Sequence, residues 1–372
     1  MSKDGFLNSQ QPNSTLICFI DDLTVFEQPE FFSNLLLSNY ISWSSEMKQR
    51  VVSGMRPTGK LHIGHYHGVL ENWIKIQDSF DCFFFVADWH SLTTEYADTS
   101  GIRESINEMV LDWIAFGLDP AKCIVFRQSL VPHHSELNLI LSMITPVSWL
   151  ERNPTYKEML DNLEAKDLST FGFLGYPVLM AADIILYKST RVPVGHDQLP
   201  HLEITREIAR RFNYLYGNVF PEPEALLTET PKLLGLDGRK MSKSYGNSIY
   251  LSDTAEETTK KVLSMMTDPA RVRRSDPGDP DVCVAFNLHR IYVPQEKLDE
   301  IIPACRSAAI GCVECKRILA ECMNDRLAPC RAKRTELAVN PQFVDELLQD
   351  GSLRASQTSD AVMAEVRDAL KI

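Results

Sequence analysis

Two histidines three residues apart stand where a predicted strand passes into a predicted helix. His62 and His65 lie in the segment 61–68, which follows a short apolar run and a turn at 53–59. The first turn of a helix offers free N–H groups and the positive end of its dipole, so it attracts phosphate, to which imidazoles can also donate. Gly64 leaves room for a nucleotide against the backbone. The pattern indicates a phosphate site, although HxxH pairs also occur in surface turns and as half of a metal site.

A second segment, far downstream, supplies positive charge. Residues 240–244 read Lys-Met-Ser-Lys-Ser and follow a turn at Asp237–Gly238. Lysine is a compact charge on a long stem, and a mobile loop can bring Lys240 and Lys243 to a bound polyphosphate as charge develops during displacement at phosphorus. A Lys/Ser-rich loop alone is usually just solvated. The two segments together, in this order, indicate one site that grips a triphosphate.

Composition narrows the class of protein. The 372 residues are 44% hydrophobic and 24% charged, which is ordinary for a globular protein of two or three domains. The net charge of −12 argues against a general nucleic-acid coat but allows local basic clusters. Two such clusters are Arg271, Arg273, Arg274 and Arg331, Lys333, Arg334. No apolar run approaches the roughly twenty residues that span a membrane. We therefore expect a cytoplasmic protein whose nine cysteines are thiols or metal ligands rather than disulfides.

The elements that must position these residues alternate along the chain. Strands are predicted at 51–54, 82–87 and 123–126, with amphipathic helices at 64–77 and 102–116. The strand at 82–87 is apolar throughout, as expected for a parallel strand covered on both faces. The predicted fold class is α/β, a doubly wound parallel sheet with ligands beyond the carboxyl ends of its strands. The chain has no GxGxxG, so nothing supports a nicotinamide site.

Three parts are predicted along the chain. Residues 1–46, rich in Ser, Asn, Gln and Phe, are predicted to be a poorly ordered leader, and translation from Met47 is an alternative. Residues 47–250 are predicted to form a Rossmann-like domain. Its later elements are a helical insertion, a helix, a strand and a second helix, at about 130–175, 176–186, 192–194 and 197–212. The pattern beyond is helical, which predicts a helical C-terminal domain at 251–372.

With these motifs the chain resembles the class I aminoacyl-tRNA synthetases, and within them the bacterial tryptophanyl-tRNA synthetases. The resemblance runs from Val51 to the C-terminus through Ser53–Gly68, Phe85–His90, Leu150–Arg152, Tyr176–Leu186, Pro193–Gln198 and Lys240–Asn247. It implies a homodimer with a Rossmann-like catalytic domain and a helical anticodon-recognition domain. It further implies that ATP, with Mg²⁺, activates L-tryptophan to tryptophanyl-adenylate, which is then transferred to tRNA(Trp).

The resemblance also implies the residues of the nucleotide site. His62 and His65 would stabilise the pyrophosphate leaving group, and Lys240 and Lys243 would close on the phosphates; these four are the implied catalytic residues. His196 stands where the family has Glu, so its role is the least defined. The implied ATP-binding residues are Arg56, Pro57, Thr58, Gly64, His65, Gly195, His196, Asp197, Lys240, Met241, Ser242, Lys243 and Ser244.

An apolar helix carries the predicted amino-acid pocket. Tyr176, Met180 and Asp183 fall at i, i+4 and i+7, on one helix face. A buried aspartate needs a partner, and a salt-bridged Asp183 beside a core-filling Met180 is the plain alternative. The resemblance implies that Asp183 accepts the indole N–H and that Gln198 binds the amino group. Met180, where tyrosyl relatives commonly carry Gln, favours tryptophan. A smaller substrate such as Phe would leave Asp183 unpaired, so it would be rejected by roughly 10⁴–10⁵ without an editing domain.

Four cysteines form a possible metal site. Cys283, Cys305, Cys312 and Cys315 have the spacing C-x21-C-x6-C-x2-C. A zinc ribbon normally has two CxxC pairs, whereas one CxxC with two further thiols also suits a [4Fe–4S] cluster. From spacing alone, scattered buried cysteines are the leading alternative. A subset of bacterial tryptophanyl-tRNA synthetases has nearly the same arrangement around a [4Fe–4S] cluster beside the anticodon-recognition region, and the resemblance implies that cluster here.

Other functions remain open from the sequence. A tyrosyl-tRNA synthetase shares the architecture. A small nucleotidyltransferase also uses HxGH but would lack the helical last third of the chain. A non-enzymatic tRNA-binding paralogue or iron–sulfur sensor would have lost one of the four implied catalytic residues, and all four are present.

Overall fold

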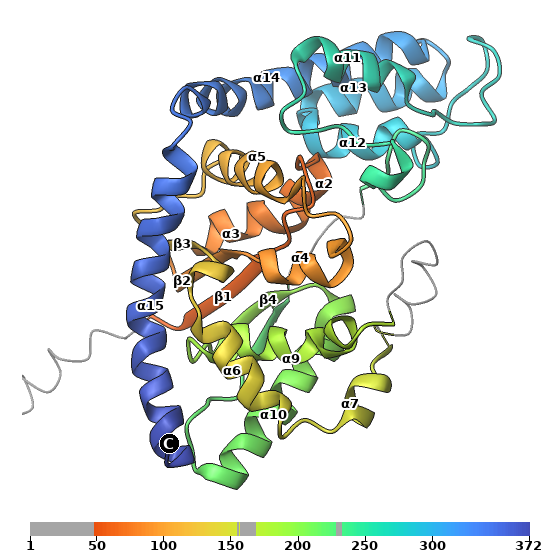
Figure 1. Ribbon diagram of the computed structural model, residues 1–372. Helices are drawn as coiled ribbons and strands as arrows, with labels where there is room; N and C mark the ends of the chain where they lie inside the picture. The colour runs from red at the N-terminus through yellow and green to blue at the C-terminus, as the bar shows by residue number, and fades with distance from the viewer. Residues whose placement is uncertain (1–47, 155, 157–168, 228–232) are drawn as a thin grey trace, which may run out of the picture. The chain divides into compact units, whose positions relative to one another are not determined.

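A parallel sheet organises the chain. The computed structural model describes residues 48–154, 156, 169–227 and 233–372, so the leader predicted at 1–46 lies outside the described residues. Within them, five parallel strands follow the order β3-β2-β1-β4-β5 (Figure 1). The strands are β1 Arg50–Met55, β2 Asp81–Val86, β3 Ile124–Arg127, β4 Arg191–Val194 and β5 Glu224–Leu227.

Helices cover both faces of the sheet and make up the C-terminal third of the chain. The longer helices are α3 Glu71–Ile76, α4 Asp88–Glu95, α5 Ile102–Ala115, α6 His133–Ser142, α7 Val147–Glu151, α9 Phe171–Ile185, α10 Leu199–Tyr216, α11 Ala255–Ser264, α12 Val284–Tyr292, α13 Gln295–Arg306, α14 Cys312–Ala338 and α15 Phe343–Leu370. The short turns are α2 Ile63–His65, a π-helical turn Tyr66–Leu70, and 3₁₀ turns at Gln128–Leu130, His196–Gln198 and Lys243–Tyr245. None of these described helices is long and apolar enough to cross a membrane.

The alternation of side chains along each strand creates two cores. Successive residues of a strand point to opposite faces. Val51 and Phe84 enter a core with α3, α5 and the C-terminal helices, whereas Val52 and Phe83 enter a second core with α6, α9 and α10. Both faces are thus covered, which is why β2 is apolar at every position but its first. The predicted doubly wound α/β fold is confirmed.

Two local features were not predicted. The helix predicted at 64–77 is interrupted, because the chain passes from α2 through the π-helical turn before α3 begins. Strand β5 was not predicted: its four residues, Glu-Ala-Leu-Leu, favour helix and show no alternation, and the strand lies half-exposed at the edge of the sheet.

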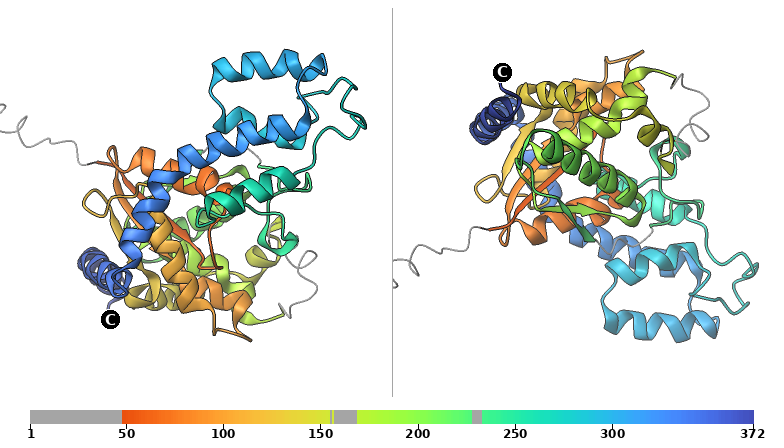
Figure 2. Two further views of the ribbon diagram at one scale, coloured as in Figure 1. Left: turned by 90° about the horizontal axis from the view of Figure 1, so that it is seen from above. Right: turned by 90° about the horizontal axis from the view of Figure 1, so that it is seen from below.

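The last helix returns to the sheet. α14 passes α5, and α15 then runs alongside β3, the other edge strand (Figures 1 and 2). Arg367 of α15 makes a two-point ion pair with Glu136 of α6. Residues Lys48–Ile372 form one compact unit. The division into domains at 250/251 stays a prediction.

A glycine permits the close approach of α15 to β3. A Cβ atom at Gly351 would lie 1.8 Å from the carbonyl oxygen of Val125, a backbone atom that cannot swing aside. We expect Gly351→Ala to lower the free energy of unfolding by roughly 1–3 kcal/mol, as overpacking does, although alanine favours helix. Urea denaturation measures this. The control is Gly175→Ala in α9, where a Cβ meets open space and should be neutral or stabilising. Equal effects of both substitutions would contradict the prediction.

Candidate functional site

Polar residues gather where the parallel strands end. The turn 56–59 follows β1, Asp88 and His90 follow β2, Gln128 follows β3, and Gly195 follows β4. The carboxyl ends of parallel strands share one edge of a sheet, which is where ligands bind in this fold class. The structure therefore presents a set of candidate ligand groups from four strands at one edge.

The two predicted phosphate-binding segments meet at this edge. The backbone N–H of Ile63 donates to Ile249 (3.0 Å), and that of Leu251 donates to Leu61 (2.9 Å), which ties the histidine segment to the chain just past residues 240–244. Lys243 Nζ donates to the carbonyls of Thr58 and Gly59, both at 3.0 Å. The second lysine thus lies directly on the turn that precedes the histidines.

The two imidazoles are stacked and neutral. The ring centroids of His62 and His65 are 3.7 Å apart. Burial, with the charge of Lys243, lowers the pKa of His62 to about 4; burial, then His62 and Lys243, lowers that of His65 to about 3. The backbone N–H of His62 donates to His65 Nδ1 (3.2 Å), so the neutral His65 ring carries its proton on Nε2. A Cβ at Gly64 would lie 2.8 Å from His62 Nδ1, so glycine is required there.

One atom of this pair lacks a partner. Within the described part of the chain, His62 Nδ1 is buried and makes no hydrogen bond. Buried polar atoms are normally satisfied, and an exception calls for an explanation such as an absent ligand. Burial also lowers the pKa of Lys243 to about 8, even though the charge of Asp112 opposes this. The site thus combines neutral N–H donors with one partly desolvated ammonium group.

The lysine-bearing loop is held by its own side chains. Met241 is buried, and the backbone N–H of Ser242 donates to Asn247 Oδ1 (2.8 Å). Asn247 Nδ2 donates in turn to Asp237 Oδ1 (2.7 Å). The hydroxyls of Ser242 and Ser244 are 2.9 Å apart. Lys240, unlike Lys243, is exposed.

The remaining predicted nucleotide residues lie around the same strand ends. Arg56 donates to Thr94 Oγ1 (2.9 Å), and Pro57 beside it is buried. Beyond β4, His196 and Asp197 are exposed, and Gln198 Nε2 donates to Asp197 Oδ2 (3.0 Å). A Cβ at Gly195 would lie 2.8 Å from the Asp197 carboxylate, so a larger residue there would displace the exposed Asp197 side chain.

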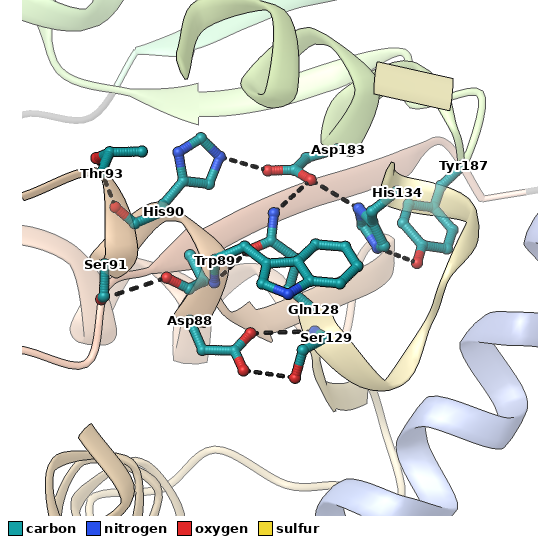
Figure 3. Close-up of polar contacts among 11 residues, drawn as sticks. Asp88, Trp89, His90, Ser91, Thr93, Gln128, Ser129, His134, Asp183 and Tyr187 are labelled. Carbon is teal, nitrogen blue, oxygen red and sulfur yellow. Dashed lines mark hydrogen bonds and ion pairs between the residues drawn. The ribbon is translucent and has the colours of Figure 1, made fainter. Parts of the chain in front are cut away.

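Asp183 lies at the centre of a buried polar network (Figure 3). Its side chain is 2% exposed. Oδ2 accepts from His90 Nε2 (2.8 Å), while Oδ1 accepts from Gln128 Nε2 (2.8 Å) and His134 Nδ1 (2.6 Å). The other nitrogen of His134 lies 2.8 Å from Tyr187 Oη. Burial would raise the pKa of Asp183, but the hydrogen bonds from His134 and His90 outweigh it, so the pKa is lowered.

The three side chains that donate to Asp183 leave one acceptor position of its carboxylate free for a ligand. A carboxylate has about four lone-pair positions, two on each oxygen. Oδ1 uses both of its positions, whereas Oδ2 uses one, on His90. The His90 ring in turn faces the edge of Tyr176, with centroids 6.5 Å apart. One acceptor position of Asp183 thus remains on Oδ2, the oxygen bonded to His90.

The other pocket residues share the face of α9 that carries Asp183. The hydroxyl of Tyr176 and His201 Nε2 are 2.7 Å apart, and His201 Nδ1 is 2.9 Å from Asn153 Nδ2. Met180 is partly buried and packs against the second core. The predicted common face of Tyr176, Met180 and Asp183 is present in α9.

The partners of Asp183 were not predicted. His90 and Gln128 follow strands β2 and β3, and His134 is the second residue of α6. The rule that strand ends converge would have drawn attention to His90 and Gln128. Nothing in the sequence around His134 indicates a contact to a residue 49 positions away.

The four predicted cysteine ligands lie near one another. Burial, followed by the charges of Cys283, Cys305 and Cys312, raises the pKa of the Cys315 thiol to about 12. Arg271 Nη1 lies 3.9 Å from Cys305 Sγ, and His289 Nε2 lies 3.2 Å from Cys315 Sγ. Among the described residues, no group of three or more His, Cys, Asp or Glu side chains is arranged to hold a metal ion.

Comparison with known proteins agrees with this geometry. Residues 44–328 match the family model for class I tRNA synthetases (W and Y). The chain is 52% identical to a tryptophan–tRNA ligase of Thermotoga maritima, covering 87% of this chain and 99% of that one, and 46% identical to one of Aquifex aeolicus, covering 87% and 100%. A crystal structure of tryptophanyl-tRNA synthetase from Campylobacter jejuni, complexed with ADP and tryptophan, superposes with a TM-score of 0.80 at 32% identity, covering 87% of this chain and all of that one.

Proposed function

The chain belongs to the class I tRNA synthetases for tryptophan and tyrosine, and we propose which of its residues carry out each step of the reaction. It is a tryptophan–tRNA ligase, which uses ATP to activate L-tryptophan and then esterifies tRNA(Trp). The observation that carries our assignment is the docking of Lys243 on the turn 58–59, directly before the stacked pair His62 and His65.

The reaction needs no covalent enzyme intermediate. The tryptophan carboxylate attacks the α-phosphorus of ATP in line; a carboxylate O–P bond forms, the bridging P–O bond breaks, and pyrophosphate leaves. A hydroxyl of the terminal tRNA ribose then attacks the carbonyl carbon, and AMP leaves. Positioning and charge stabilisation carry both steps.

The catalytic groups bind the triphosphate in two ways, as neutral hydrogen-bond donors and as cations. His65 donates Nε2–H as a neutral imidazole, and His62 offers its buried, unpaired edge. Lys243 leaves the carbonyls of Thr58 and Gly59 for the phosphates, and the exposed Lys240 joins it as the loop closes. ATP would enter as its Mg²⁺ complex, and the metal would help to neutralise the negative charge of the phosphates.

The remaining nucleotide residues frame ATP. Backbone and side chains that follow β1 and β4, with the loop that carries the lysines, line the nucleotide. They are Arg56, Pro57, Thr58, Gly64, Gly195, His196, Asp197, Met241, Ser242 and Ser244.

Tryptophan is recognised at the Asp183 network. The indole N–H donates to the open position on Asp183 Oδ2, next to His90. Met180 provides soft, polarisable contact to the indole ring, and Tyr176 borders it. Gln198 binds the amino group. A substrate without the N–H leaves a buried acceptor unsatisfied, which is the basis of specificity.

ATP–pyrophosphate exchange with a panel of amino acids tests the function. We expect exchange with tryptophan and none above background with tyrosine or phenylalanine. Exchange that depends on tyrosine, or no exchange with any amino acid, would refute the assignment.

The pH dependence of ATP affinity should report on Lys243. Its pKa of about 8 leaves roughly a tenth of the amine charged at pH 9, so we expect the Kd of ATP to rise by up to about tenfold between pH 7 and 9. Lys243→Arg keeps its charge over this range and should show no such rise. Titration calorimetry measures both proteins. Parallel curves for the two would contradict the prediction.

We also propose a [4Fe–4S] cluster that is held by Cys283, Cys305, Cys312 and Cys315. Two observations suit an anionic group. The charges of the other three thiols act on Cys315, and the cationic Arg271 lies beside Cys305. A cluster is larger than one ion, so its ligands need not form a single-ion site. When bound, it would cross-link three segments of the helical domain and could exchange one electron.

Spectroscopy after anaerobic purification tests the cluster. Visible sulfur-to-iron absorbance, with iron and acid-labile sulfide in equal amounts near four per chain, would support it, in keeping with four irons and four sulfides per cluster. The absorbance should be lost in Cys315→Ser and kept in Cys330→Ser. Zinc or no metal in the protein as isolated would refute it.

Residues 251–372 read the anticodon in this proposal, and Arg271, Arg273 and Arg274 face the RNA. Of these, Arg273 and Arg274 are exposed. Phosphate contacts of arginine weaken with salt. Arg273→Gln and Arg274→Gln should therefore weaken tRNA(Trp) binding and reduce its salt dependence, while tryptophan-dependent exchange without tRNA stays unchanged.

A second copy of the chain covers an apolar cavity beside α9. The cavity, of about 580 Å³, is bordered by α4, α6 and the start of α9. Leu139 and Phe171 on its rim are 58% and 79% exposed, and Leu92, Tyr96 and Val147 add to the same patch. Such patches are typical of subunit interfaces. Light scattering should give a dimer, which Phe171→Asp converts to monomer. Tyr214→Asp changes an exposed residue of α10 that does not border the cavity, and should leave the dimer intact.

A further inference from the structure

The chain beyond His65 adopts a conformation that its own backbone does not favour. Residues Tyr66–Leu70 form a π-helical turn in which the N–H of Glu71 reaches back to the carbonyl of Tyr66. Such turns are rare and are frequently found at functional sites. Contacts from elsewhere in the fold must therefore hold this turn, and with it the two catalytic imidazoles, in place.

The first of these contacts comes from α12. The buried ring of His67, in the π-helical turn, has Nδ1 at 2.9 Å from Glu71 Oε2 and Nε2 at 2.9 Å from Tyr292 Oη. Glu71 can only accept, so neutral His67 carries its proton on Nδ1, and Nε2 accepts the Tyr292 hydroxyl proton. Tyr292 is the last residue of α12 and is also buried.

The second contact comes from α14. Arg334 donates Nε to Asp112 Oδ1 (2.7 Å) and Nη2 to Glu108 (2.8 Å). Asp112 is fully buried in α5, and its carboxylate also interacts with the backbone N–H of Leu61, the residue before His62. Its charge acts on Lys243 as well. Arg334 thus holds a carboxylate that faces both phosphate-binding segments.

Both contacts start from the helices that carry the cysteines. Cys283 directly precedes α12, and Cys312 begins α14. The two helices meet where His289 contacts Cys315 Sγ (3.2 Å). Tyr292 of α12 contacts the segment 61–71 directly at His67, whereas Arg334 of α14 acts on it through Asp112, whose carboxylate interacts with Leu61.

We propose that Tyr292 and Arg334 are positioning residues for adenylate formation. Both lie on C-terminal helices and hold the segment 61–71 in place. The rate of catalysis therefore depends on how those helices are arranged. This inference rests on the proposed function. Neither side chain touches the reacting atoms; each acts through His67 or Asp112.

Steady-state ATP–pyrophosphate exchange with purified full-length variants tests the proposal. Tyr292→Phe removes only the hydroxyl and should lower kcat roughly 2–10-fold, whereas Arg334→Gln leaves Asp112 buried without its cation and should lower kcat tenfold or more. The KM for tryptophan should stay unchanged in both, because the Asp183 network is not involved. Arg334→Lys keeps the charge and should recover part of the loss.

Matched controls separate positioning from general destabilisation. Arg290→Gln in α12 and Glu321→Gln in α14 alter exposed side chains on the same helices and should leave kcat unchanged. Unchanged kcat in Tyr292→Phe and Arg334→Gln would overturn the proposal, as would equal losses in the controls or a KM for tryptophan that changes in step with kcat. An inactive wild-type protein would instead refute the proposed function, so the two failures are distinguishable.

Discussion

Lys243→Ala is expected to lower the rate of tryptophanyl-adenylate formation by roughly 10²–10³-fold while the affinity for tryptophan is unchanged. Loss of one preorganised group that stabilises developing charge typically has an effect of this size. Lys243 lies on the turn 58–59 before the histidines, whereas tryptophan is bound by the separate Asp183 network. Single-turnover adenylate formation and calorimetric tryptophan binding measure the two quantities.

A lysine outside the site provides the control. Lys260 is exposed on α11, so Lys260→Ala should leave both quantities unchanged. If Lys243→Ala forms adenylate at the wild-type rate, the lysine has no role in the chemistry. If it loses tryptophan affinity as well, the separation of the two parts of the site is wrong.

Asp183→Asn is expected to lower kcat/KM for tryptophan by up to roughly 10⁴-fold. The amide has only one acceptor oxygen, and its NH₂ group would face the side chains of His90, Gln128 and His134, which now donate to the carboxylate. The indole N–H then loses its charged acceptor. The substitution should also reduce stability by roughly 1–3 kcal/mol, because donors are left unsatisfied.

A substrate analogue distinguishes recognition from folding. Benzothienylalanine has sulfur in place of the indole N–H and nearly the same shape. The wild-type protein should strongly prefer tryptophan to this analogue, and Asp183→Asn should lose most of that preference in pyrophosphate exchange. If Asp183→Asn still prefers tryptophan to the analogue, Asp183 does not recognise the indole N–H. This conclusion does not depend on the stability of the variant.

Local pattern and long-range contact explain what the sequence could and could not predict. The apolar β2 and the strand–turn–helix around His62 are visible locally, so the sheet and the approach of Lys243 to that turn could be predicted. Asp183 was expected to need a partner, but its donors come from β2, β3 and α6 and are joined only by folding. The π-helical turn at 66–70 depends on contacts with distant α12, which no local period reveals.

The position of α15 has a consequence for how the protein is made. β3 is an edge strand, and exposed edges can pair with strands of other chains. The helix that packs against it comes from residues 343–370, far downstream of β3 in the sequence. During synthesis the β3 edge of the nascent sheet therefore stays open until residues 343–370 have left the ribosome. Ribosome stalling before residue 343 should leave a folded but aggregation-prone chain, which chaperones would have to shield.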